Sequence, residues 1–454
     1  MGALVAAISK QNQDVTPDVI EMLNALKHRG NDGHGLSTPT TVTTAKTLNE
    51  LKPANISNVV LGHNYSKTLP RDHMQPVQGN GFTLVFEGHI YPAPNLPGAS
   101  EPKEIAEKLG SNPIKNAYST VEKMAGSYVF AVAQPDRLTV GRDVFGTTPL
   151  YYAENDSICA VASERKALWK LGLTNVESFP PGNVATITPS GFTFTEEKTL
   201  YTSPKSVVDM QTASEALELL LLDATRRQVS DLDRVAVAFS GGVDSSVVAV
   251  LAKNVGLNVQ LIAVGLKNQH DVELAEQAAE VLELPLHTQT YTIDNLKQTL
   301  PKALWLIEEN HAVNACIAIP FYWLAQTAQK LGHNVLLAGQ GADELFGGYQ
   351  RYLTEYKNMG AEAVEKTMFN DVKNAYSQNF QRDNQICSSQ NVELRLPYID
   401  CPVVDFALRL PLRLKLASTD DPLRKRILRR VAQNMEIPEF IADKPKKAMQ
   451  YTTA

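Results

Sequence analysis

The feature that most constrains the fold is a glycine turn that joins a strand-like run to a helix-like run. The apolar run Val235–Phe239 is typical of a buried strand, and Val247–Lys253 is typical of a helix. Between them lies Ser240-Gly-Gly-Val-Asp-Ser-Ser246. The glycines allow a tight bend and a close approach of the backbone to a ligand. The helix start supplies unpaired N–H groups and the positive end of a dipole, so this turn predicts a phosphate cradle.

The chemistry of this turn differs from that of the lysine-bearing mononucleotide loop, because no Gly-x-x-x-x-Gly-Lys-Ser/Thr run occurs in the chain. The turn resembles the pyrophosphate loop of enzymes that split ATP into AMP and pyrophosphate. Its serines add hydroxyl donors, and Asp244 adds a carboxylate that suits a metal ion. The alternative is an ordinary strand-to-helix turn, which we rank lower because seven suitable residues occur in the right context.

A second, acidic loop also follows an apolar run. Asn334–Ala338 leads into Gly339-Gln-Gly-Ala-Asp-Glu-Leu-Phe-Gly-Gly-Tyr349. Asp343 and Glu344 supply hard oxygen ligands, and Mg²⁺ usually takes one or two protein carboxylates. Asp244 and Asp343 are therefore the predicted metal pair, with a glycine-rich loop carrying solvated carboxylates as the alternative. The loop lacks the third glycine of a dinucleotide fingerprint, which argues against a nicotinamide site.

Positive charge gathers near the end of the chain, in Arg424–Arg430 and in Lys444–Lys447. The pattern of the first run predicts a mostly solvated helix face. One of the later lysines is predicted to reach a polyphosphate, because charge that develops on a leaving pyrophosphate requires a fixed cation.

The first 200 residues or so mix many short β-type runs with few helical ones, which favours an α+β layered domain. The β-type runs include 59–63, 82–86, 128–132 and 183–188. Thr202–Ser206 is interpreted as a linker. A helix is predicted to begin just after Thr212, in a capping box with Glu215.

Beyond that helix, strand-like and helix-like runs alternate, which predicts a doubly wound parallel sheet. The predicted strands are 235–239, 259–265 and 334–338, with helices 272–284 and 319–331 between them. Ligands of such sheets bind at the carboxyl ends of strands. The two glycine loops are therefore expected to face one cleft.

Composition excludes several classes of protein. A length of 454 residues suggests two to four domains. A net charge of −6 argues against nonspecific nucleic-acid binding. The four cysteines form no Cys-x-x-Cys pair, so neither a dense disulfide framework nor a zinc site is expected. No apolar run approaches the length of about 20 residues that crosses a membrane. Residues 1–10 are interpreted as a buried strand rather than a secretion signal, which makes the cytoplasm the expected compartment.

The order of the motifs resembles the asparagine synthetases of the glutamine-dependent, AMP-forming type. The likeness is carried by 26–35, 142–152, 162–168, 240–246, 263–265, 339–349, 393–400 and 444–446. It implies an N-terminal-nucleophile αββα sandwich of class II glutamine amidotransferase type over residues 1–201. It further implies a linker over 202–212 and a doubly wound α/β ATP pyrophosphatase domain over 213–454.

The resemblance also implies roles for individual positions. The adenosine side would contact Phe239, Val264, Ala338 and Gly339, and the phosphates would contact Ser240, Gly241, Gly242 and Ser245. Mg²⁺ would be bound by Asp244 and Asp343. The α-phosphate and pyrophosphate would contact Lys446. The implied cofactors are ATP and Mg²⁺. The implied partners are a small carboxylate, aspartate by default, and ammonia or an amine. A homodimer is a further expectation.

The glutamine site departs from the family pattern at four places. The nucleophilic cysteine after the initiator Met is replaced by Gly2, which has no side chain and cannot form a thioester. The arginine that clamps the glutamine carboxylate is replaced by Tyr65, and the Asn-Gly-Glu triplet reads Glu87-Gly88-His89. We therefore expect the first domain to lack glutaminase activity.

The synthetase site departs as well. Gln340 stands where the family has a catalytic glutamate, and a primary amide cannot accept a proton at neutral pH. Gln340 can still donate a hydrogen bond, so adenylation is expected while amine attack lacks its base. Glu308, Glu309 and His311 are the nearby candidates for that base. The segment His311–Ile317 also differs from the family variants, which puts aspartate in question as the acceptor.

Four functions remain open. The leading hypothesis is an ATP-dependent, AMP-forming amide ligase of the asparagine synthetase kind. A β-lactam-synthetase-like enzyme would close a ring with the substrate's own amine, but Gln340 is not the tyrosine expected there. A non-catalytic ATP-binding regulator is favoured by the altered residues and opposed by the intact phosphate loop. A transfer-RNA modifying enzyme is disfavoured by the acidic composition.

Overall fold

The computed structural model describes residues 2–52, 55–92, 100–201, 204–267 and 270–444. The chain divides into two compact units. The first comprises Met1–Thr199 with Ser388–Asn391, and the second comprises Leu200–Cys387 with Val392–Ala454. Within the described ranges, no helix is both long and apolar enough to span a membrane.

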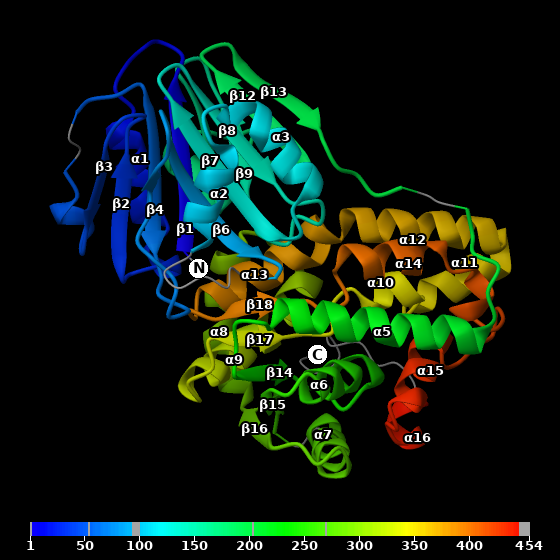
Figure 1. Ribbon diagram of the computed structural model, residues 1–454. Coiled ribbons are helices and arrows are strands. Elements are labelled where there is room, and N and C mark those ends of the chain that lie inside the picture. Colours follow the sequence, from blue (N-terminus) through cyan, green and yellow to red (C-terminus); the bar gives the residue numbers. More distant parts are fainter. Residues whose placement is uncertain (1, 53–54, 93–99, 202–203, 268–269, 445–454) are drawn as a thin grey trace. The chain divides into compact units, whose positions relative to one another are not determined.

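The first unit contains two antiparallel sheets of seven and six strands (Figure 1). The seven-stranded sheet has the order β11-β9-β10-β1-β4-β2-β3. Its strands are β1 (Gly2–Ser9), β2 (Gly33–Ser37), β3 (Val42–Ala45), β4 (Val59–Tyr65), β9 (Tyr151–Glu154), β10 (Ile158–Ala162) and β11 (Glu177–Ser178). The six-stranded sheet has the order β13-β12-β8-β7-β6-β5. Its strands are β5 (Val77–Gln78), β6 (Thr83–Ile90), β7 (Gly126–Gln134), β8 (Arg137–Arg142), β12 (Asn183–Thr188) and β13 (Gly191–Glu196).

Helices cover the outer face of each sheet, so the unit is an αββα sandwich with three apolar layers. Helices α1 (Thr16–Ala25) and α4 (Arg165–Lys170) cover the larger sheet, and α2 (Glu101–Leu109) and α3 (Pro113–Lys123) cover the smaller one. Strand β1 shows why the layers form, because successive side chains of a strand point to opposite faces. Its odd-numbered residues 3, 5 and 7 pack under α1 and α4, whereas residues 4, 6 and 8 pack between the sheets. The sandwich expected for the N-terminal half is confirmed.

The second unit is built on a five-stranded sheet of order β16-β15-β14-β17-β18 in which every neighbouring pair is parallel. The strands are β14 (Arg234–Ala238), β15 (Asn258–Leu266), β16 (Leu286–Tyr291), β17 (Val335–Leu337) and β18 (Glu393–Arg395). The chain adds strands on one side of β14 and then on the other, so β14 and β17 flank a topological switch point. Ligands of open α/β sheets bind at such a point.

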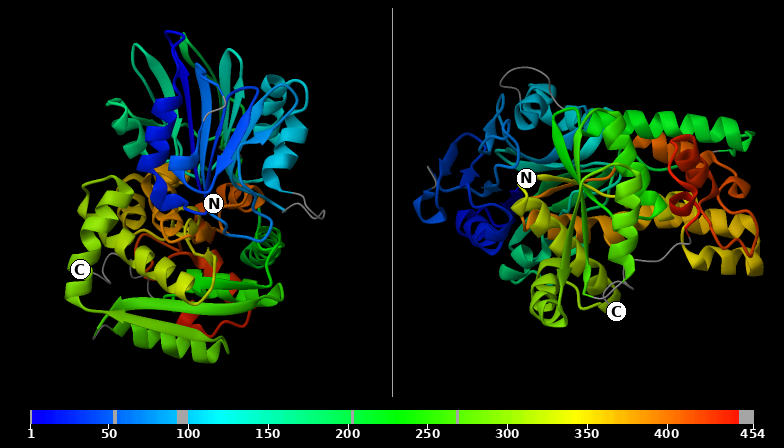
Figure 2. Two further views of the ribbon diagram at one scale, coloured as in Figure 1. Left: turned by 90° about the vertical axis from the view of Figure 1, so that its left-hand side faces the viewer. Right: turned by 90° about the horizontal axis from the view of Figure 1, so that it is seen from below.

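Helices lie on both faces of this sheet (Figure 2), which confirms the doubly wound prediction. They are α5 (Met210–Gln228), α6 (Val243–Asn254), α7 (His270–Val281), α8 (Ile293–Ile307), α9 (Ala312–Lys330), α10 (Ala342–Phe346), α11 (Gln350–Met359), α12 (Ala361–Ala375), α13 (Gln381–Ser388), α14 (Cys401–Arg409), α15 (Arg426–Asn434) and α16 (Glu439–Ala442). A π-helical turn, Tyr376–Phe380, joins α12 to α13.

Two helix starts differ from the sequence prediction. Helix α5 begins at Met210 rather than after Thr212, because Asp209 is the N-cap. The Asp209 carboxylate accepts the backbone N–H of Thr212 at 3.0 Å and its hydroxyl at 2.9 Å, so Thr212 donates instead of capping. Helix α9 begins at Ala312 and runs through Pro320, since buried residues continue its apolar face toward the N-terminus. The linker prediction falls partly on residues 202–203, which lie outside the described residues.

Candidate active site

The glycine turn joins β14 to α6, as predicted. Gly242 is the N-cap of α6, and Ser245 lies in the first turn of the helix. The Ser245 hydroxyl accepts the Ser240 N–H at 3.2 Å and donates to the Gly242 carbonyl at 3.2 Å. These hydrogen bonds lie within the loop and hold its backbone in a tight turn. Ser240 is exposed, and the loop leads directly into a 12-residue helix. Such a start is a ready site for a phosphate.

The acidic loop, which links β17 to α10, lies directly against the glycine turn. A Cβ built on Gly339 would stand 3.1 Å from the Asp244 Cβ, which is tight enough that only glycine allows this approach without a shift. The Tyr398 hydroxyl donates to the Asp244 carbonyl at 3.0 Å and fixes the turn from another side. The two loops predicted to face one cleft are thus in contact within one unit.

The two aspartates of the predicted metal pair converge on a single cation. Lys425 Nζ lies 2.6 Å from Asp244 Oδ2 and 2.5 Å from Asp343 Oδ1. The Lys425 side chain is 1% exposed, whereas the two aspartates are 17% and 18% exposed. Two carboxylates that already meet at one positive charge form a donor set that suits Mg²⁺, which prefers hard oxygen ligands.

Backbone strain helps to place this lysine. Arg424 and Lys425 have φ values of +55° and +53°, and two consecutive non-glycine residues in the left-handed region cost on the order of 1–3 kcal/mol each. Arg424 compensates by donating to the Gly348 carbonyl at 2.8 Å, and its own N–H binds Asp421 Oδ1 at 3.1 Å. Strain of this kind concentrates at functional sites.

The solvated-face prediction for Arg424–Arg430 is wrong for most of its basic residues. Arg424, Lys425 and Arg429 are buried, and only Arg426 and Arg430 of the five are exposed. The run straddles the start of α15 instead of lying along one of its faces. Arg429 turns inward and donates to the Arg424 carbonyl at 2.7 Å. No local pattern singles out Lys425 among five similar side chains.

Gln340 is hydrogen-bonded to a carboxylate that sequence reasoning missed. Its Nε2 donates to Asp383 Oδ2 at 2.5 Å. Asp383 lies on α13, is fully buried, and accepts the Arg382 Nε–H at 2.8 Å on its other oxygen. Two of the residues proposed from the sequence as the base have other partners. Glu308 accepts a hydrogen bond from Gln385 at 3.3 Å, and Glu309 accepts one from Asn314 at 2.6 Å.

Glu344, the neighbour of Asp343, is inside the protein. Its Oε1 accepts the Tyr349 hydroxyl at 2.6 Å and the Asn379 amide at 2.7 Å. Burial, and next the charge of Asp343, raise the pKa of Glu344. Asp343 is therefore the better candidate of the two for a metal ligand.

The positions assigned to the adenosine side lie at the carboxyl ends of adjacent strands. Phe239 directly follows β14 and donates its N–H to the Ile262 carbonyl at 2.9 Å. Ala338 directly follows β17 and donates its N–H to the Arg395 carbonyl at 3.2 Å. Val264 lies in β15 and is half-buried. Lys446 falls outside the described residues, so its role stays a prediction.

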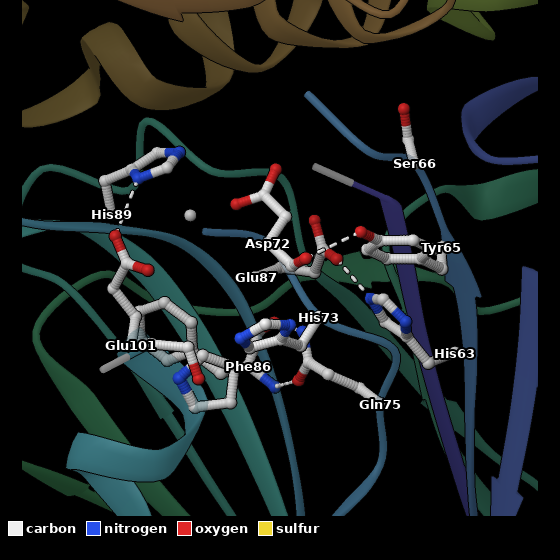
Figure 3. Close-up of a pocket in the computed structure, with 13 residues that line it drawn as sticks. His63, Tyr65, Ser66, Asp72, His73, Gln75, Phe86, Glu87, His89 and Glu101 are labelled. Carbon is white, nitrogen blue, oxygen red and sulfur yellow. Dashed lines mark hydrogen bonds and ion pairs between the residues drawn. The ribbon is translucent and has the colours of Figure 1, made fainter. Parts of the chain in front are cut away.

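The first unit contains a separate polar pocket around Glu87 (Figure 3). Glu87 accepts the Gly2 N–H at 2.7 Å and forms a 2.5 Å hydrogen bond with His63. Burial alone would raise the pKa of Glu87, but the hydrogen bond and charge of His63, with a further contribution from Arg29, lower it to about 2. The cavity here measures about 30 Å³, which is room for about two water molecules.

The residues that replace the expected glutamine ligands are engaged with one another. The Tyr65 hydroxyl donates to the Asp72 carbonyl at 2.8 Å, and burial raises the pKa of Tyr65 to about 12. It is neutral near pH 7 and cannot clamp a carboxylate as arginine does. His89, next to Gly88, lies 3.0 Å from Glu101 (Figure 3). Glu101 also forms an ion pair with Arg71 at 2.8 Å.

Gly2 leaves no room for a side chain in the present backbone. It pairs with Tyr65 across β1 and β4, and a Cβ built on it would overlap the carbonyl oxygen of Asn64. The position that holds the nucleophile in the resembled enzymes is therefore filled by main chain.

Both halves of the chain match families of known proteins. Residues 1–203 match the glutamine amidotransferase domain, and 216–363 with 354–454 match the asparagine synthase family. A putative glutamine-hydrolysing asparagine synthetase of Methanocaldococcus jannaschii is 31% identical and covers 99% of this chain and 93% of its own. The chain belongs to the asparagine synthetase family.

More distant relatives include the asparagine synthetase of Triphysaria versicolor. It is 23% identical over a match that covers 96% of this chain and 74% of its own. Among solved structures, a glutamine phosphoribosylpyrophosphate amidotransferase from B. subtilis aligns with a TM-score of 0.37 at 16% identity, covering 63% of this chain and 65% of the other.

Proposed function

We propose that this family member activates a carboxylate with ATP, releases pyrophosphate, and forms an amide from free ammonia or a substrate amine instead of glutamine. The observation that carries the proposal is the convergence of Asp244 and Asp343 on one cation beside the glycine turn. A site with this geometry can hold a metal–triphosphate complex where a helix start supplies N–H donors.

The residues of the two loops and their neighbours would have separate roles in this reaction. Asp244 and Asp343 would hold Mg²⁺, which neutralises charge on the phosphates when bound. Ser240 and the start of α6 would donate to phosphate oxygens. Lys425 supplies a fixed positive charge at the same point, since it is buried and cannot turn away. Lys446 remains the candidate for contact with the α-phosphate and pyrophosphate.

Aspartate is the default acid, and ATP–pyrophosphate exchange with a panel of carboxylic acids is the test. We expect aspartate to raise exchange at least roughly tenfold above the acid-free rate, a difference of about 1.4 kcal/mol in activation free energy. If exchange occurs only with another acid, that acid replaces aspartate as the proposed substrate and the proposed adenylation chemistry stands. No exchange with any acid would contradict the ligase proposal and favour an ATP-binding regulator.

We also propose that the first unit has no glutaminase activity. Three observations support this: a glycine at the nucleophile position, a cavity of about 30 Å³, and a neutral Tyr65 in place of a clamping cation. The amidotransferase match of residues 1–203 then reflects the ancestry of this unit.

Gly2→Cys is expected to leave glutamate release from glutamine at the background rate. The new side chain would overlap Asn64, so we also expect a loss of stability of roughly 1–3 kcal/mol, typical of overpacking. Coupled glutamate detection and thermal unfolding measure the two effects. Gly2→Ala is the matched control and should lower the melting temperature similarly. Glutamine-dependent amide formation by the native chain would contradict this proposal.

A further inference from the structure

We propose that the buried Asp383 fixes the Gln340 amide with its Oε1 directed away from Asp383, so that this oxygen accepts a hydrogen bond from the attacking nitrogen. Asp383 is then a positioning residue that acts through Gln340. The inference rests on the amide-forming reaction proposed above and concerns its second step.

The orientation of the amide follows from donor and acceptor chemistry. The Gln340 group that faces Asp383 is the NH₂ group, because Nε2 donates to the carboxylate oxygen Oδ2 at 2.5 Å. The planar amide then places its carbonyl oxygen on the opposite side. Gln340 itself is partly exposed, and in this proposal the carbonyl oxygen is the atom that contacts the substrate.

Asp383 is held firmly enough to impose this orientation. It is fully buried, and Arg382 Nε donates to its second oxygen at 2.8 Å. Arg382 is anchored in turn by the Gln378 carbonyl at 3.1 Å and Asn314 Oδ1 at 3.2 Å. A buried carboxylate with both oxygens hydrogen-bonded is held in place.

The position of Gln340 suits a role in nitrogen attack. It follows Gly339, which packs against Asp244, so its side chain starts at the edge of the predicted phosphate site. When ammonia attacks the acyl-adenylate, a C–N bond forms and the C–O bond to AMP breaks, with the electron pair leaving on AMP. One proton leaves the nitrogen, and because an amide is not a base at neutral pH, it passes to water.

This arrangement changes what restoring a glutamate would do. Gln340→Glu alone would put two carboxylates at the 2.5 Å separation now seen between Gln340 and Asp383. Like charges at such a distance cannot both ionise, so the pair would share a proton and the new residue would be a poor base. Combining Gln340→Glu with Asp383→Asn keeps one negative charge and one hydrogen bond and moves the charge onto the loop.

The test compares the native chain with Gln340→Glu, Asp383→Asn and the double variant. Amide formation is measured against ammonia concentration and is divided by the rate of ATP–pyrophosphate exchange of the same variant. We expect Asp383→Asn to raise the KM for ammonia about tenfold, the value of about one hydrogen bond. We expect Gln340→Glu to be slower than the native chain and the double variant to recover, with a pH profile that shows a new base.

Several results would overturn the inference. These are an unchanged KM for ammonia in Asp383→Asn, or a Gln340→Glu variant as active as the double variant. Gln340→Met keeps the size of the side chain and removes the carbonyl oxygen. It is the second variant if Asp383→Asn does not fold, and the inference requires that it raise the KM for ammonia. Absence of exchange in the native chain would instead refute the ligase proposal, so the two failures are distinguishable.

Discussion

Asp244→Asn is expected to reduce ATP–pyrophosphate exchange by roughly two to three orders of magnitude, as happens when one preorganised electrostatic contact to a developing charge is removed. The Asp244 carboxylate lies 2.6 Å from Lys425 and shares that cation with Asp343. Asparagine keeps the size of the side chain and removes half of the negative charge that can hold a metal. The measurement is exchange at saturating ATP and aspartate over a range of Mg²⁺ concentrations.

The Mg²⁺ dependence separates a metal ligand from a structural residue. A lost ligand raises the Mg²⁺ concentration needed for half-maximal exchange, so excess Mg²⁺ recovers part of the rate. Asp405→Asn is the matched control, because Asp405 forms an exposed ion pair with Arg409 at 2.9 Å, and exposed pairs contribute little. Full exchange in Asp244→Asn at the native Mg²⁺ requirement would refute the metal assignment.

Lys415→Met is expected to stabilise the second unit by several kcal/mol at neutral pH. Lys415 is 4% exposed, and burial, followed by repulsion from Lys205, lowers its pKa to about 7 despite the nearby Glu365. The unfolded chain holds this proton up to a pKa near 10.5. A pKa difference of one between the folded and unfolded chains corresponds to about 1.4 kcal/mol, so the buried amine is costly, whereas methionine fills the same space without a charge.

The sign of the pH dependence provides a second measurement. Between pH 7 and pH 10.5 the unfolded chain binds more protons at Lys415 than the folded chain, so this residue makes stability rise with pH across that window. The full destabilisation by Lys415 is present below pH 7 and disappears above pH 10.5. Calorimetry from about pH 6.5 to about pH 9, which spans the folded-state pKa, should show a flatter profile for Lys415→Met than for the native chain. Lys297→Met, at a 72% exposed position, should change little. If Lys415→Met lowers the melting temperature and keeps the native dependence of stability on pH, the assignment of a destabilising buried charge to Lys415 is refuted.

The parts of the site that depend on local geometry could be predicted from the sequence. A strand, two glycines and a helix start that follow one another directly determine their own backbone path, and the turn at 240–246 formed as expected. The same holds for the acidic loop after β17. Strand β1 was also recognisable, because a run that is apolar at nearly every position suits a strand buried on both faces.

The partners of those loops could not be predicted, because they come from distant parts of the chain. Lys425 lies 181 residues from Asp244, and Asp383 lies 43 residues from Gln340. Neither residue has a local pattern that marks it, since one sits in a basic run and the other in a polar helix. The capping error at Thr212 has a different origin, as Asp209 accepts the backbone N–H of Thr212 and so starts the helix earlier.

The buried ammonium between Asp244 and Asp343 has a consequence for the resting protein. Two acidic groups that face each other would otherwise repel and splay the loops that carry them. The Lys425 ammonium offsets one of the two negative charges, so it holds the loops together while a charge of −1 remains. In the proposed reaction, a divalent ion would therefore not be needed to hold the two loops together, and it would bind and leave with the nucleotide.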